Sequence, residues 1–116
     1  MTRRDARLFV DDMLQAVEDI LEVTAGLDRQ QFMATPVLQK AIIHDLLVLG
    51  EAAAQMPDDV RPISPDIPWR RIVGMRNKLI HGYFGVDLDL VYVVAKKTVP
   101  ALRDPLERLR ATLDAS

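Results

Sequence analysis

The sequence of 116 residues contains no cysteine, which excludes disulfide bonds, thiolate metal centres and a cysteine nucleophile. This absence is typical of a protein that works in a reducing compartment. The chain also has only one Trp, two Tyr and three Phe, so broad base stacking on single-stranded nucleic acid is not expected. Its two histidines are the only side chains that ordinarily titrate near neutral pH.

Long hydrophobic runs are missing as well. Arg3, Arg4 and Asp5, followed by Asp11 and Asp12, interrupt the N-terminal region, which therefore does not resemble a secretory signal peptide. No apolar run approaches the roughly twenty residues that a membrane-spanning helix needs. We therefore expect a cytoplasmic protein with no membrane partner.

The composition and the length of the chain are typical of one folded domain. Hydrophobic residues make up 49% and charged residues 28% of the sequence, as in soluble globular proteins. The length is enough for one sizeable core and too short for two. We expect a single domain over residues 1–116.

Apolar residues recur with helical spacing from the start of the chain. A stripe with a period of about 3.6 residues predicts an amphipathic helix over 4–25, which Gly26 ends. Asp28 and Gln31 then have the spacing of a capping box, which predicts a short helix.

A second long helix is predicted over 36–56, with Thr35 as its N-cap. Residues 57–68 hold four of the seven prolines and are predicted to form a loop. The next helix is expected to begin at Trp69 and to end at Gly82. We interpret Trp69 as an anchor in the core rather than as a platform for a nucleic-acid base.

The C-terminal third predicts one more helical stretch. Asp87 or Asp89 can cap its start, and Pro100 is expected to kink it before it continues over 102–113. No pair of strands is evident. The predicted fold is therefore all-α, a bundle of four or five helices with a kinked C-terminal helix.

Positive charge is concentrated between residues 69 and 86. This segment holds Arg70, Arg71, Arg76 and Lys78 and no acidic residue, a local charge of +4. The rest of the chain has 11 basic against 17 acidic residues, so the net charge of −2 combines a basic segment with an acidic remainder. Such a segment can bind an anion such as RNA through Arg70, Arg71 and Lys78. The alternative is a solvated cationic helix face.

Within this segment, Arg76 and His81 do not share a helix face, because five residues correspond to a rotation of about 140°. Asn77 and His81 do share a face, on a polar stripe with Arg70 and Gly74.

Arginine and histidine without metal ligands suit cleavage of RNA by its own 2′-hydroxyl. Arg76 can hold phosphate oxygens and His81 can move a proton. The reaction benefits from both an acid and a base, and one histidine per chain supplies only one of them at a time. A two-fold dimer that joins the two copies of this segment is therefore expected. The structural alternative is that His81 caps its helix and Arg76 pairs with a carboxylate inside the bundle.

The string RNKLIHGY, with Arg76, Asn77, His81 and Tyr83, resembles the Arg-x4-His-x-Tyr signature of the HepT-like toxins in the HEPN superfamily. The resemblance covers essentially the whole chain. Further similar residues lie at 50–52, 67–69 and 84–87.

This resemblance implies a HEPN-like bundle that acts as a homodimeric, metal-independent endoribonuclease without a cofactor. It implies that Arg76 and His81 are catalytic and that Asn77 supports them. The expected substrate is tRNA or mRNA, and the expected biological role is that of the toxin in a toxin–antitoxin module.

The resemblance further implies a cognate antitoxin, a minimal nucleotidyltransferase of the MNT type that transfers AMP from ATP to Tyr83. The added phosphate would oppose RNA binding beside His81 through both bulk and charge. A second function remains open: a non-catalytic helical module that binds a nucleotidyltransferase and helps to present nucleotide or substrate.

His44 departs from the family pattern, which often has an arginine there. It lies in line with Val37, Val48 and Glu51 on a second, partly apolar helix face, which is a candidate dimer contact. We expect a partly buried His44 that is hydrogen-bonded to the backbone or to Glu51, rather than a catalytic residue.

Overall fold

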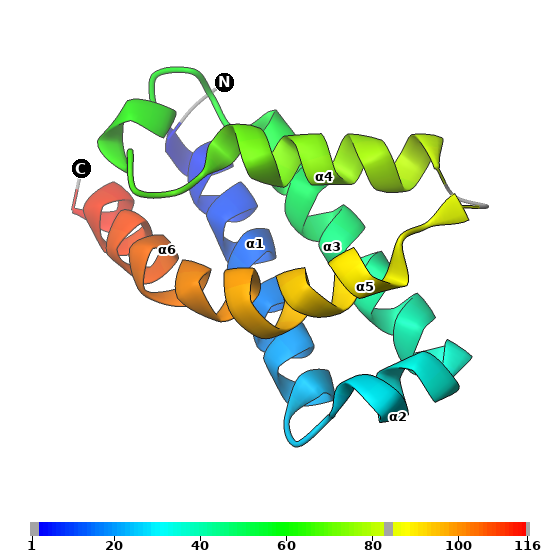
Figure 1. Cartoon of the computed structure of the whole chain (residues 1–116). Helices are drawn as coiled ribbons and strands as arrows, with labels where there is room; N and C mark the ends of the chain where they lie inside the picture. The colour runs from blue at the N-terminus through cyan, green and yellow to red at the C-terminus, as the bar shows by residue number, and fades with distance from the viewer. Residues whose placement is uncertain (1–2, 83–84, 116) are drawn as a thin grey trace.

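The computed structural model describes residues 3–82 and 85–115, which form only helices and the loops between them (Figure 1). This confirms the predicted all-α bundle. The helices are α1 (Arg3–Thr24), α2 (Arg29–Ala34), α3 (Pro36–Gln55), the short 3-10 helix η1 (Arg61–Ile63), α4 (Trp69–His81), α5 (Leu88–Val93), the π-helical turn η3 (Val94–Thr98) and α6 (Val99–Asp114).

The link between α1 and α2 follows the predicted local signals. Gly26 has a φ of 70°, a left-handed conformation that favours glycine, and α1 ends just before it. The carboxylate of Asp28 accepts a hydrogen bond from the Gln31 backbone N–H at 2.7 Å. The Gln31 side chain accepts in return from the Asp28 N–H at 3.0 Å, so the capping box is confirmed.

Thr35 occupies the N-cap position of α3, but its side chain does not cap the helix. Its hydroxyl instead donates to the carbonyl oxygen of Gln31 at 2.7 Å, one turn earlier in α2. The expected hydroxyl cap is therefore wrong, because the carbonyl at the end of α2 offers a competing acceptor. Pro36 at the first turn remains as the local start signal.

Helix α1 packs against α3 on one side and against α6 on the other, and α4 packs on α3 (Figure 1). One connected cluster of buried apolar side chains joins these helices. Its largest fully buried members include Met13, Phe32, Ile42, Leu46 and Leu106. Helix α4 contributes Trp69, Ile72 and Leu79 to the same cluster, so its contact with α3 determines where α4 sits.

The C-terminal helical stretch begins at Asp87, whose carboxylate accepts from the Leu90 N–H at 3.2 Å. Helix α5 continues through η3 into α6, and the Val99 N–H bonds to the Val94 carbonyl five residues back. Pro100, in the first turn of α6, has no N–H to continue the regular pattern. Where the sequence predicts a kink at Pro100, the structure has a π-helical turn that ends at Thr98, just before Val99 and Pro100.

Candidate functional site

Helix α4 carries the basic segment and is anchored at its first residue. Trp69 is 8% exposed, and its indole N–H donates to the Ser64 carbonyl oxygen at 3.1 Å. This confirms Trp69 as a core anchor. At the other end, the Gly82 N–H bonds to the Lys78 carbonyl at 2.9 Å and α4 ends at His81.

One side of α4 is buried and the other is cationic. Ile72 and Leu79 face the core with Trp69. The side chains on the opposite side that sequence analysis singled out are exposed: Arg70, Arg71, Asn77, Lys78 and His81. Tyr83 lies outside the described residues.

Three of the four Arg and Lys side chains of α4 have no carboxylate partner among the described residues. Elsewhere, most arginines form ion pairs: Arg7 with Asp114, Arg29 with Asp89, Arg103 with Glu18, Arg108 with Asp66 and Arg110 with Asp11. Within residues 3–82 and 85–115, no carboxylate pairs with Arg70, Arg71 or Lys78. These three cations are therefore available to an external anion.

Arg76 lies on the side of α4 that faces α3, opposite Gly50. A methyl group placed on Gly50 would lie 2.3 Å from Cβ of Arg76 and 3.3 Å from the Ile72 carbonyl oxygen. Both distances are shorter than ordinary van der Waals contact. The lack of a side chain at Gly50 therefore allows the two helices to approach closely at Arg76.

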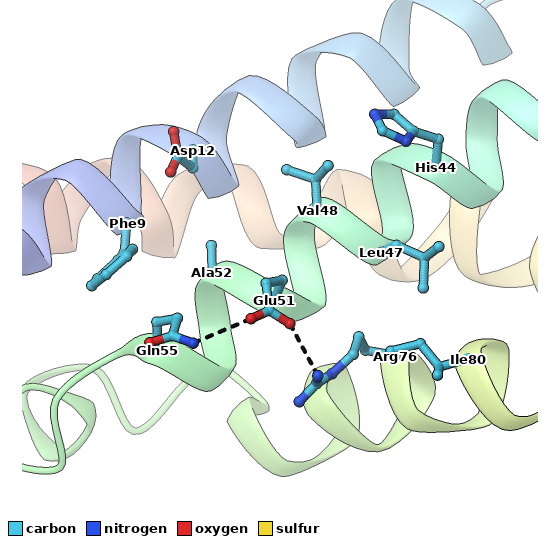
Figure 2. Close-up of a pocket in the computed structure, with 10 residues that line it drawn as sticks. All are labelled: Phe9, Asp12, His44, Leu47, Val48, Glu51, Ala52, Gln55, Arg76 and Ile80. Carbon is cyan, nitrogen blue, oxygen red and sulfur yellow. Dashed lines mark hydrogen bonds and ion pairs between the residues drawn. The ribbon is translucent and has the colours of Figure 1, made fainter.

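The guanidinium of Arg76 is held by Glu51, the residue after Gly50. Nη1 of Arg76 donates to Oε2 of Glu51 at 3.0 Å, and the Gln55 amide donates to Oε1 of Glu51 at 3.2 Å (Figure 2). The Arg76 side chain is 21% exposed and that of Glu51 is 55% exposed. Arg76 thus pairs with a carboxylate, as the structural alternative expected, but this carboxylate is largely exposed on α3 rather than inside the bundle.

Beside this pair lies an open pocket of about 400 Å³ between α1, α3 and α4 (Figure 2). Its apolar lining comes from Phe9, Leu47, Val48, Ala52 and Ile80. Its polar lining comes from Asp12, His44, Glu51, Gln55 and Arg76. Ile80 is 49% exposed, so a largely apolar surface is open to solvent next to Arg76.

His44 is exposed and lines this pocket, so the expectation of a partly buried histidine is wrong. No hydrogen bond joins it to Glu51 or to the backbone among the described residues. Its electrostatic neighbour is Asp45. Burial and the Asp19 carboxylate raise the pKa of Asp45 above its ordinary value, and the charge of His44 partly offsets this rise.

Sequence reasoning did not assign Glu51 to the site. Gly50 and Glu51 could be recognised only as part of a family-like string, because their role depends on how α3 meets α4. Glu51 is 25 residues from its partner Arg76 in the chain. No local spacing rule connects residues at such a separation.

The described residues offer neither a metal-binding cluster nor a membrane-spanning helix. No three His, Asp or Glu side chains gather closely enough there to hold a metal ion. None of the helices described combines the length and apolar character required to cross a membrane.

Comparison with known proteins identifies relatives over nearly the whole chain. A family model described as "Ribonuclease HepT-like" matches residues 13–109. A Thermococcus cleftensis protein named "Probable ribonuclease HepT" is 36% identical over 108 residues, which cover 93% of this chain and 98% of that protein. A Methanocaldococcus jannaschii protein named "Putative RNase MJ0125" is 37% identical over 114 residues, which cover 98% of each chain. No solved structure matches the chain significantly.

The close approach at Gly50 predicts opposite effects for two glycine substitutions. Gly50→Ala should destabilise the fold by about 1–3 kcal/mol, because the added methyl group overlaps Arg76. Gly74→Ala, also within a helix, meets nothing within 4 Å and should be neutral or stabilising by up to about 1 kcal/mol. Urea unfolding of both variants measures this difference, and equal unfolding free energies would contradict the close approach.

Proposed function

Since this chain belongs to the HepT-like ribonuclease family, we propose that it is an endonuclease that cleaves RNA without a metal ion. The family match over residues 13–109 is the observation that carries this proposal. The exposed His81 and the unpaired cations of α4 support it, because RNA is a polyanion. In the cell the protein acts as the toxin of a toxin–antitoxin module.

In the proposed reaction, the 2′-oxygen of RNA attacks the neighbouring phosphorus and the bond to the 5′-oxygen breaks. The products are a 2′,3′-cyclic phosphate and a 5′-hydroxyl. His81 takes the proton from the 2′-hydroxyl or gives one to the leaving 5′-oxygen. The Arg76 guanidinium stabilises the negative charge that develops on the phosphate oxygens. Asn77 supports these two catalytic residues through hydrogen bonding.

The reaction uses both an acid and a base, and each chain offers one exposed histidine on α4. A two-fold homodimer supplies the second histidine. The pocket beside Arg76 supports this part of the proposal, because Ile80, Phe9 and Val48 form an apolar surface that a second copy can cover.

Arg70, Arg71 and Lys78 bind the RNA backbone in this proposal. Their exposure and their lack of carboxylate partners in the described part of the chain support this role. Contacts of this kind attract phosphates without selecting a base sequence. Recognition of tRNA or mRNA then depends mainly on the shape of the RNA.

We further propose that an MNT-type nucleotidyltransferase inactivates the protein by transferring AMP to Tyr83. The tyrosine oxygen attacks the α-phosphate of ATP, and pyrophosphate leaves. Tyr83 is two residues beyond His81 in the chain, so the added phosphodiester would place a negative charge near the site that binds RNA.

One observation favours a second candidate function. Arg76 is already paired with Glu51, as expected if its role is to hold the bundle together. The chain would then be a non-catalytic module that binds a nucleotidyltransferase. This candidate predicts tight binding of that partner, no growth inhibition on expression alone and no effect of replacing His81.

Cleavage assays separate the two candidates. Purified protein in excess EDTA should cut RNA and leave 2′,3′-cyclic phosphate ends, while 2′-O-methyl RNA stays intact. Arg76→Ala and His81→Ala should each lower the cleavage rate by about 100-fold or more. Arg103→Ala serves as control and should retain activity, because Arg103 is on α6 and pairs with Glu18 of α1. Uncut RNA with wild-type protein, or full activity of His81→Ala, would contradict the proposal.

Mass spectrometry tests the proposed modification. Protein co-expressed with an MNT-type nucleotidyltransferase antitoxin should gain the mass of one or more AMP groups, and Tyr83→Phe should abolish the gain. Tyr92→Phe is the matched control, because the Tyr92 hydroxyl already donates to the Leu27 carbonyl at 3.3 Å. AMP retained by Tyr83→Phe, or no AMP with an active partner enzyme, would contradict Tyr83 as the acceptor.

A further inference from the structure

We propose that Glu51 is a positioning residue for Arg76, an inference that rests on the proposed cleavage of RNA at this site. The carboxylate of Glu51 holds Nη1 of Arg76 at 3.0 Å, as described above. Nothing in the family match assigns this role to Glu51.

The arginine is fixed at both ends. At its base, Cβ of Arg76 lies against Gly50, where the backbones of α3 and α4 come close. At its tip, Glu51 holds the guanidinium, and Gln55 in turn holds Glu51 at 3.2 Å. All three supporting residues lie on α3, a helix of 20 residues with a buried face. A long side chain with several rotatable bonds is thereby restricted to one region before substrate binds.

Glu51 occupies only part of the hydrogen-bonding capacity of Arg76. A guanidinium has five N–H donors, and Glu51 engages Nη1. The Nε atom is buried and has no acceptor among the described residues. Nη2 likewise has no acceptor in the described part of the chain. Arg76 can therefore donate to a phosphate oxygen through Nη2 while Glu51 continues to hold Nη1.

A purely stabilising role explains the pair less well. Glu51 is 55% exposed, and ion pairs at such positions contribute little to the free energy of folding. Arg103 and Glu18 form a comparable pair at 2.8 Å, with side chains 49% and 44% exposed. That pair joins α6 to α1 away from α4, so it provides a matched control.

The opposite role would be competition, in which Glu51 keeps phosphate away from Arg76. The two roles give opposite results when Glu51 is removed. A competitor raises activity when it is lost, because the cation becomes available. Loss of a positioning residue lowers kcat, because the Arg76 guanidinium is no longer held in the orientation that the reaction requires.

Steady-state cleavage of one RNA oligonucleotide tests the inference with wild type, Glu51→Ala, Glu51→Gln and Glu18→Ala. Glu51→Ala should lower kcat by about 10- to 100-fold and change KM by no more than about twofold. Glu51→Gln should recover most of the loss, because its amide oxygen still accepts from Arg76. Glu18→Ala should match wild type.

An unchanged or raised kcat in Glu51→Ala would overturn the inference, and so would a Glu51→Gln variant as slow as Glu51→Ala. Either result with an active wild type leaves the proposed function intact, whereas an inactive wild type overturns both. Thermal melting checks that each variant is folded. If Glu51→Ala is unfolded, Gln55→Ala decides: a smaller fall in kcat supports the inference and an unchanged kcat overturns it.

Discussion

The contact between Gly50 on α3 and Arg76 on α4 sets the geometry of the candidate site. A side chain at position 50 would overlap Arg76 and crowd the α4 backbone at Ile72, so α4 could not lie where it does. With α4 in this place, its buried face meets the core and its cationic face turns outward. The same approach brings Arg76 within reach of Glu51. The contact between α3 and α4 therefore fixes both how the helices pack and where the Arg76 guanidinium lies.

The charge distribution follows from this arrangement. Most arginines outside α4 are paired with carboxylates, in a remainder of the chain that has 11 basic against 17 acidic residues. On α4, Arg70, Arg71 and Lys78 have no such partners within residues 3–82 and 85–115. A chain of net charge −2 can therefore present a cationic face to RNA. Arg76, which is held by Glu51, and the exposed His81 lie on different sides of α4. The proposed reaction involves a second copy because it uses both an acid and a base, and each chain offers one exposed histidine on α4.

Features governed by local chemistry could be predicted from the sequence. The end of α1 at Gly26, the capping box at Asp28 and the start of α4 after Pro68 each depend on a few neighbouring residues. Features governed by packing between helices could not. The Glu51 partner of Arg76 requires knowledge of which helix covers α4. The exposure of His44 requires knowledge that no other part of the described chain covers that face of α3.

The proposed reaction depends on contact between RNA phosphate and the Arg76 guanidinium that Glu51 holds. The most direct measurement is the NMR signal of the Arg76 guanidinium during titration with 2′-O-methyl RNA, which cannot be cleaved through its 2′-oxygen. If Arg76 contacts phosphate, its resonance should shift as RNA binds, while that of Arg103, paired with Glu18, should stay in place. RNA that binds without moving the Arg76 resonance would show that Arg76 does not contact phosphate.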